Sequence, residues 1–78
     1  MNVTVRYFAS MRDRMGCADE VVSIGGDAST VAAVWTMVSE GKPMPPSTLI
    51  AVNMSYTDAA AVLKDGDELA FFPPVTGG

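Results

Sequence analysis

The 78-residue sequence contains no histidine and only one cysteine, Cys17. These absences exclude histidine-based catalytic triads, metal sites built from histidine or from several cysteines, and an internal disulfide bond. The sequence also lacks a phosphate-binding loop of the form G-x-x-x-x-G-K-S/T and a glycine pattern for binding dinucleotides. We therefore expect that the chain is not a self-sufficient enzyme and that it holds no metal and no tightly bound cofactor.

Basic residues are also scarce, with five Lys and Arg against nine Asp and Glu, and the formal net charge is −4. This balance argues against binding to nucleic acid or to an anionic membrane, because phosphate groups are bound by clustered Lys and Arg. No apolar run approaches the roughly 20 residues of a membrane span. Residues 1–5 lack the basic and apolar regions of a signal peptide. We expect a cytoplasmic protein with no nucleic-acid and no membrane partner.

What the sequence does contain is a high apolar fraction, 49%, arranged in patterns that predict secondary structure. Residues 2–9 alternate, with Val3, Val5 and Tyr7 on one face and mostly polar residues on the other. This alternation predicts a strand. Its exception is Phe8, an aromatic residue on the polar face.

A second strand is predicted over residues 19–24, with Val22 and Ile24 on its inner face. Residues 10–15 between the two strands are a short polar connection with room for one or two helical turns, which Gly16 would end. Because the connection is short, we expect the two strands to pair antiparallel.

A helix is predicted over residues 30–40, where apolar residues recur on one side at i, i+3, i+4 and i+7. These residues are Val31, Val34, Trp35 and Val38. Asp27 and Ser29 are both candidate N-caps, because their side-chain oxygens can accept a hydrogen bond from a free backbone N–H. Gly41 is the expected end of the helix.

The second half of the sequence predicts short strands separated by turns. The expected strands are residues 49–53, a very short 56–57, and 68–72. The expected connections are a proline-rich loop at 42–48, at most one helical turn at 58–64, and a tight turn at 65–67.

This order of elements predicts an α+β fold, with one mixed sheet and one main helix packed across one of its faces. The ubiquitin-like β-grasp fits the order best. Its domain would be residues 1–72, and residues 73–78 would form an extended, flexible C-terminal tail ending in Gly-Gly. A ferredoxin-like fold is the alternative, but it needs a second full helix, for which residues 58–64 are a poor candidate.

Four features resemble functional sites but have simpler interpretations. Cys17 has no histidine or lysine nearby to lower its pKa, so we interpret it as a loop residue rather than a reactive thiol. Residues 12–14, Arg-Asp-Arg, are typical of a solvated face. Residues 65–68, Asp-Gly-Asp-Glu, have too few further acids for a calcium loop and are interpreted as an acidic turn. The six methionines are interpreted as core filler.

Phe8 and Phe72 are more informative, because strand alternation turns both away from the helix. If the first and last strands are neighbours, as a β-grasp requires, the two rings lie close together on the helix-free side. Neighbouring exposed aromatics often mark a protein–protein surface. A cluster covered by a loop is the equal alternative.

The sequence ends in Phe71-Phe72-Pro73-Pro74-Val75-Thr76-Gly77-Gly78. The two prolines cannot continue a hydrogen-bond ladder and favour a stiff, extended exit from the last strand. The four residues beyond them can reach about 13–14 Å, and a glycine backbone passes through channels too narrow for a Cβ atom. An ordinary frayed terminus is the alternative. Because nothing else in the sequence is suited to chemistry, the terminal carboxylate of Gly78 is the predicted working group.

The same C-terminal residues carry a family resemblance. Residues 65–78, DGDELAFFPPVTGG, resemble the C-terminal signature of the molybdopterin synthase small-subunit family, the sulfur carriers of molybdenum cofactor biosynthesis. The pattern is completed by residues 5–9 (VRYFA), Arg12, Gly16, residues 51–53 (AVN) and Lys64.

The resemblance implies a β-grasp fold and a defined cycle for the chain. An E1-like adenylating enzyme would use ATP and Mg²⁺ to convert the Gly78 carboxylate to a glycyl-adenylate. A sulfur donor protein would then convert the adenylate to a thiocarboxylate (1-thioglycine). Inside the large subunit of molybdopterin synthase, the sulfur would pass to cyclic pyranopterin monophosphate to build the dithiolene of molybdopterin. The chain would thus be a non-catalytic carrier in a heterotetramer, with the catalytic residues on the large subunit.

The resemblance also implies roles for individual residues. Phe8, Arg12 and Phe72 fall at positions that contact the large subunit and the activating enzyme, and Tyr56 stands where the family usually has an aliphatic contact residue. The remaining partner-binding residues belong to the tail that ends in the reactive Gly77-Gly78, and they are Pro73, Pro74, Val75 and Thr76. A sulfur carrier of thiamine synthesis, a ubiquitin-like modifier and a β-grasp interaction module with an inert tail are the alternatives. The Phe-Phe-Pro-Pro segment favours the molybdopterin branch.

Overall fold

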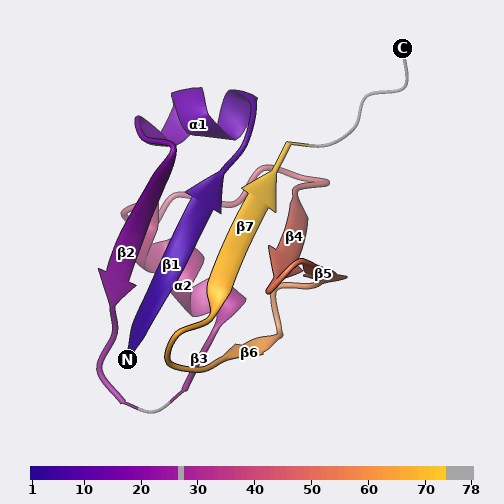
Figure 1. Cartoon of the computed structure of the whole chain (residues 1–78). Helices are drawn as coiled ribbons and strands as arrows, with labels where there is room; N and C mark the ends of the chain where they lie inside the picture. The colour runs from indigo at the N-terminus through magenta and orange to yellow at the C-terminus, as the bar shows by residue number, and fades with distance from the viewer. Residues whose placement is uncertain (27, 74–78) are drawn as a thin grey trace.

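The structure, a computed structural model, describes residues 1–26 and 28–73 (Figure 1). Their elements are, in chain order, β1 Asn2–Tyr7, α1 Ser10–Met15, β2 Asp19–Ser23, β3 Ser29–Thr30, α2 Val31–Val38, β4 Leu49–Val52, β5 Ser55–Thr57, β6 Val62–Leu63 and β7 Glu68–Phe72. Five of the strands form one sheet in the order β2-β1-β7-β4-β5, and β3 pairs with β6 in a second, two-stranded sheet.

The main sheet is mixed, with its only parallel pair at the centre. β1 and β7 run parallel, whereas β1 with β2, β4 with β7 and β4 with β5 are antiparallel. Helix α2 lies across one face of this sheet and leaves the other face without a helix (Figure 1). The architecture confirms the α+β prediction with one main helix on one face, and it confirms that the first and last strands are neighbours. The ferredoxin-like alternative is wrong, because residues 58–64 form no second full helix.

The core lies between the sheet and α2 and is built by strand alternation. Val3, Val5 and Tyr7 of β1 are all buried, as predicted, and Leu69 and Phe71 of β7 are fully buried beside them. On α2 the buried positions are Val31, Val34 and Trp35, with Val38 partly buried against the same core. Burial of this kind contributes about 1.5–3 kcal/mol for each large apolar side chain.

Helix α2 begins later and ends earlier than the sequence predicts. Its N-cap is Thr30, whose Oγ1 accepts a hydrogen bond from the backbone N–H of Ala33 at 3.2 Å. The predicted cap Ser29 is wrong, because the helix begins one residue later and Ser29 lies one position before the cap, paired with Leu63 in the small sheet. The other predicted cap, Asp27, lies outside the described residues. The helix ends at Val38, and the chain turns away through left-handed backbone at Glu40 and Gly41, with φ of 58° and 83°.

Two further segments differ from the sequence predictions. Residues 58–64, expected to form at most one turn, contain strand β6, whose Leu63 is fully buried in the core. The interpretation of the methionines as core filler holds for the buried Met11 but not for Met54, whose side chain is 92% exposed at the β4–β5 turn. The short connection at residues 10–15 does form a helix, α1, and Gly16 ends it with φ of 79°.

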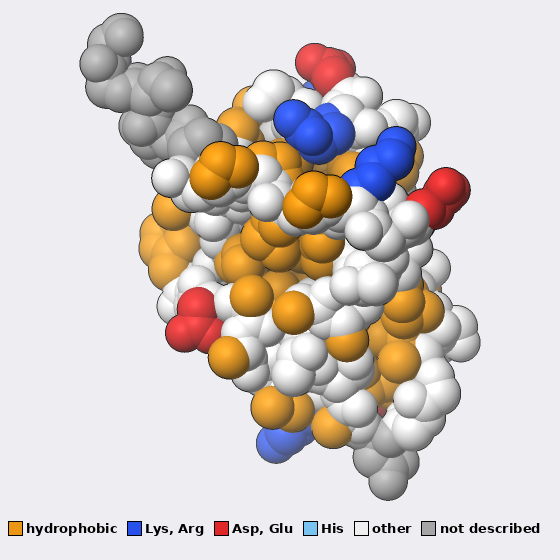
Figure 2. Space-filling model, turned by 180° about the vertical axis from the view of Figure 1, so that it is seen from behind, with side chains coloured by type: hydrophobic (Ala, Val, Ile, Leu, Met, Phe, Trp, Pro, Cys, Tyr) orange, Lys and Arg blue, Asp and Glu red, His pale blue; other side chains and the backbone are white. Residues whose placement is uncertain are grey.

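Figure 2 shows the molecule from the helix side. Apolar side chains are spread over the middle of this face, and basic side chains gather near the end of the molecule where α1 lies. A hollow between the ends of α1 and α2 is lined in part by Arg14, Trp35 and Lys42. The Trp35 indole N–H donates to the Lys42 carbonyl at 2.9 Å, so this region locks the end of α2 to the following loop.

Candidate partner-binding face and C-terminal tail

The helix-free face of the sheet carries a stacked aromatic pair. The parallel register of β1 and β7 pairs Tyr7 with Phe71, so the next residues, Phe8 and Phe72, emerge side by side on the opposite face. Their ring centroids are 4.6 Å apart and the rings are within 8° of parallel. The Phe8 backbone N–H donates to the Phe71 carbonyl at 3.1 Å, which holds the pair in register. This arrangement confirms the prediction that both rings lie together on the helix-free side.

Tyr56 extends the aromatic pair across the sheet. It lies on the edge strand β5, its ring centroid is 6.2 Å from that of Phe72 in an edge-on arrangement, and its side chain is 74% exposed. Phe8 and Phe72 are half-buried and Tyr56 is exposed, so among the described residues the aromatic cluster is partly open to solvent. An open apolar cluster on a small protein is typical of a surface that a partner covers.

The three aromatic rings border a hollow of about 510 Å³ on this face. Its lining residues come from β1, β4, β7 and the β4–β5 hairpin, and from the residue that follows β1. They are Arg6, Phe8, Ala51, Met54, Tyr56, Glu68, Ala70 and Phe72. Ala51, Ala70 and Met54 were not predicted as site residues.

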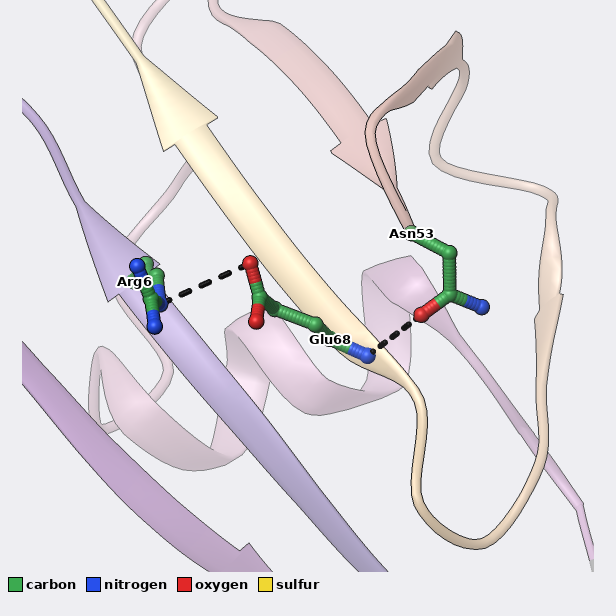
Figure 3. A network of polar contacts seen from close by, with 3 residues as sticks. All are labelled: Arg6, Asn53 and Glu68. Carbon is green, nitrogen blue, oxygen red and sulfur yellow. Dashed lines mark hydrogen bonds and ion pairs between the residues drawn. The ribbon is translucent and has the colours of Figure 1, made fainter.

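A polar network borders the same hollow and fixes the β4–β5 turn (Figure 3). Glu68 lies between Arg6, whose Nε is 3.5 Å from the Glu68 carboxylate, and Asn53, whose Oδ1 accepts the Glu68 backbone N–H at 3.0 Å. Asn53 has left-handed backbone with φ of 49°, a conformation that asparagine tolerates better than most residues. Asn53 therefore holds the turn that carries Met54 against the start of β7.

The acidic turn at residues 65–67 is structural. The Asp67 carboxylate accepts hydrogen bonds from the Asn53 side-chain amide at 3.0 Å and from the Lys64 backbone N–H at 2.8 Å. The Asp65 carboxylate accepts the Asn2 backbone N–H at 2.7 Å. These contacts agree with the interpretation of the segment as a turn rather than a cation site. Residues 1–26 and 28–73 contain no group of three or more His, Cys, Asp or Glu that could hold a metal ion.

The same hydrogen bonds make stability depend on pH. The Asn53 amide, and then the Lys64 backbone N–H, lower the pKa of the Asp67 carboxyl, so the ionised form contributes stability that is lost as pH falls through its lowered pKa. We expect Asp67→Ala to reduce the free energy of unfolding at pH 7 by about 1–2 kcal/mol and to flatten its decline between about pH 5 and pH 2. Urea denaturation across this range measures both effects. Identical pH profiles for the variant and the parent protein would contradict this assignment.

Cys17 has the environment of an unreactive thiol. Burial, and then the charge of Glu20, raise the pKa of the Cys17 thiol, whose sulfur lies 3.6 Å from the Glu20 carboxylate. The same carboxylate accepts the Tyr7 hydroxyl at 2.8 Å, and burial with this hydrogen bond raises the pKa of Tyr7. A raised pKa keeps the thiol protonated and weakly nucleophilic, which agrees with the interpretation made from the sequence.

Arg12 is exposed on α1 and does not line the hollow among the described residues. It follows Phe8 closely in the chain, because α1 begins two residues after that aromatic ring. Its predicted contact with a partner would therefore lie beside the aromatic face rather than on it.

The C-terminal tail begins where β7 ends, next to Phe72. Pro73 is half-buried and lies outside the strand. The predicted tail residues Pro74, Val75, Thr76, Gly77 and Gly78 lie outside the described residues, so their assigned roles stay predictions. Among the described residues no helix is long and apolar enough to span a membrane.

The sheet order, the single main helix and the aromatic face opposite it define a ubiquitin-like β-grasp protein. The ThiS family model matches residues 5–78 of the chain. The chain is 34% identical over 86 residues to the molybdopterin synthase sulfur carrier subunit of Escherichia coli, with 97% of this chain and 99% of that protein covered. The chain belongs to the ThiS family.

Solved structures of similar proteins share the fold. Small archaeal modifier protein 1 from Haloferax volcanii is 25% identical with a TM-score of 0.79, and both chains are covered completely. A complex of subunits 1 and 2 of the molybdopterin-converting factor from Helicobacter pylori contains a chain that is 27% identical with a TM-score of 0.68, again with complete coverage of both chains. The β-grasp prediction and the family resemblance read from the sequence are both confirmed.

Proposed function

We propose that the chain is the sulfur carrier subunit of molybdopterin synthase. The observation that carries the proposal is its full-length similarity to proteins of that name in bacteria and eukaryotes. The position of the open aromatic face supports it, because the chain leaves the sheet toward Gly78 directly beside that face. A carrier needs both a reactive C-terminal end and a surface that binds a partner and positions that end.

The proposed reaction takes place at the Gly78 carboxylate. A carboxylate is a poor electrophile, so an E1-like enzyme with ATP and Mg²⁺ first joins one carboxylate oxygen to AMP and releases pyrophosphate. Hydrosulfide released by a sulfur donor protein then attacks the carbonyl carbon, the carbon–oxygen bond to AMP breaks and AMP leaves, which produces the thiocarboxylate. This thiocarboxylate is ionised at neutral pH and is a soft nucleophile that can deliver sulfur to cyclic pyranopterin monophosphate.

The chain acts in this proposal as a non-catalytic subunit. The large subunit supplies the pterin site and the catalytic residues, and the assembly is a cytoplasmic heterotetramer with two small subunits at opposite ends of a large-subunit dimer. The solved complex of the two Helicobacter pylori subunits supports a large-subunit partner of this kind.

The test begins with intact-mass measurement of the full chain after incubation with its cognate activating enzyme, ATP, Mg²⁺ and a sulfur donor. We expect exchange of one oxygen for sulfur that maps to Gly78, and no exchange when ATP is omitted. The thiocarboxylated chain mixed with the cognate large subunit and cyclic pyranopterin monophosphate should then yield molybdopterin. Absence of any sulfur exchange would overturn the carrier function.

A ubiquitin-like modifier is the second candidate, because small archaeal modifier protein 1 has the same fold at 25% identity. This function predicts isopeptide conjugates between Gly78 and lysines of other proteins. A sulfur carrier for thiamine synthesis predicts instead that the thiocarboxylate supports thiazole formation. The product that forms with purified partners therefore separates the three functions, and an inert tail would give none of them.

A further inference from the structure

We infer that the hollow on the helix-free face is a socket for one protruding apolar side chain of the protein that receives the C-terminal tail. The inference rests on the proposed function and specifies how the carrier docks. It assigns roles to Ala51, Ala70 and Met54, none of which was predicted from the sequence as a site residue.

The floor of the socket is a consequence of strand register. A straight row crosses four strands, in which Arg6 pairs with Ala70, Ala70 with Ala51, and Ala51 with Tyr56. The two middle positions of the row are the alanines Ala70 and Ala51, which have the smallest side chains. The two end positions are the large residues Arg6 and Tyr56. Neighbouring strands lie about 4.7–4.9 Å apart, so the floor is two residues wide and matches a single large side chain.

The two alanines belong to this face and not to the core. Ala51 is 5% exposed and Ala70 is 8% exposed, yet neither belongs to the cluster of buried side chains between the sheet and α2. Their low exposure comes from the taller side chains around them. A partner side chain placed on this floor would therefore be desolvated on several sides, which is the environment of a binding hot spot.

The walls of the socket are held in place by contacts within the protein. On one side the Phe8–Phe72 stack is fixed by the pairing of β1 with β7. On the opposite side Met54, with left-handed backbone at φ of 70°, is held by the hydrogen bonds of Asn53 to β7. Methionine on an exposed wall is suited to this role, because its flexible thioether adapts to the shape of a partner.

The position of the socket identifies its occupant. Five residues follow Pro73, and in extended form they reach about 16–18 Å. A protein that holds the Gly78 carboxylate in its active site must therefore approach within that distance of Pro73, which directly follows Phe72, a wall of the socket. The same distance limit applies to the activating enzyme. We assign the socket to the large synthase subunit, because a similar chain has been solved in complex with its second subunit. Among the described residues, the charges on its rim are Arg6 and Glu68, which lie 3.5 Å apart and pair with each other, so the floor favours an apolar side chain such as Leu, Met or Phe.

The test fills the socket without disturbing the core. Ala70→Leu adds its new atoms on the open side of the sheet, so we expect an unfolding midpoint equal to or above that of the parent protein. Because the partner side chain loses its place, binding to the cognate large subunit should weaken about 30-fold or more, the threshold of a hot spot. Isothermal titration calorimetry with the full chain measures the dissociation constant. The matched control is Val21→Leu on β2, which pairs beside Thr4 on the same face and is 68% exposed outside the hollow, and it should bind as the parent protein does.

A second variant keeps the inference testable if Ala70→Leu folds poorly. Met54→Ala truncates a side chain that is 92% exposed, so it removes a wall at little cost to folding, and binding should weaken about 10-fold. If Ala70→Leu folds and binds the large subunit as the parent protein does, the socket is overturned. If Ala70→Leu does not fold, unchanged binding of Met54→Ala overturns it. A dimer of the free chain that Ala70→Leu dissolves would assign the socket to a second copy and overturn its assignment to the large subunit.

The proposed function can be tested separately from the socket. Adenylation and thiocarboxylation of Gly78 in the parent protein test the carrier function without reference to the large subunit. Phe8→Asp serves as a positive control for use of the aromatic face. A thiocarboxylated parent protein whose binding responds to Phe8→Asp but not to a folded Ala70→Leu would leave the function standing and overturn the socket alone.

Discussion

Deletion of Gly78 is expected to reduce sulfur transfer by more than 100-fold, and addition of one residue after Gly78 is expected to do the same. Each change moves the terminal carboxylate by one residue, about 3.3–3.6 Å along an extended chain. A displacement of about 1 Å at a reacting group can already cost 100-fold in rate. The tail cannot compensate, because its starting point is fixed where β7 ends beside the docking face.

Two measurements check this expectation on the same preparations. Intact mass after timed incubation with the activating enzyme, ATP and a sulfur donor gives the rate of thiocarboxylate formation. Thermal unfolding should be unchanged, because the core formed by residues up to Phe71 is untouched. Sulfur transfer at the parent rate in either length variant would show that the reactive carboxylate is not that of Gly78 in its native place.

The parts of the fold that the sequence predicts well are those set by local periodicity. Val3, Val5 and Tyr7 alternate with polar residues, and all three are buried in β1. The four-residue apolar stripe of α2 is on the core side of the helix, as its spacing indicates. In these segments each residue's environment is decided by neighbours within a few positions of the chain.

The parts that the sequence does not predict depend on pairing between distant segments. Ser29 resembles an N-cap, but strand β3 includes both Ser29 and Thr30, so the helix begins only after Thr30, which provides the cap. The local sequence predicts that Leu63 belongs to a short helical turn, but Leu63 is in a strand because it pairs with β3. Such pairs are more than thirty residues apart, and no local pattern carries that information.

The candidate site divides in the same way. Phe8 and Phe72 could be placed on one surface from alternation and the family fold, and the structure stacks them. The socket floor could not be predicted, because it requires Ala70 and Ala51 to be opposite each other in the β4–β7 register. An alanine in a strand carries no signal by itself, and only its large neighbours on adjacent strands make it the bottom of a hollow.

Two adjacent phenylalanines lie on opposite sides of the sheet: Phe71 faces the core, and Phe72 belongs to the docking face formed by Phe8, Tyr56 and Phe72. Phe71 is fully buried, and its ring meets that of Trp35 edge-on at 5.0 Å and stacks on that of Tyr7 at 6.2 Å. Phe72 faces the other way and stacks on Phe8. Substitution by alanine should therefore impair folding at Phe71 and partner binding at Phe72.

Phe71→Ala is expected to cost about 3–5 kcal/mol of unfolding free energy, because it leaves a cavity at the centre of the core. A domain of this length has about 4–12 kcal/mol in total, so much of this variant should be unfolded at 37 °C. Phe72→Ala should cost only about 1–2 kcal/mol, mainly the loss of the stack on Phe8, and should remain folded. Its binding to the large subunit should nevertheless weaken about 30-fold or more, as for a hot-spot aromatic residue. Urea denaturation and calorimetric titration of both variants separate the two effects, and a Phe72→Ala protein as unstable as Phe71→Ala would place both rings in the core and remove the basis for a docking face.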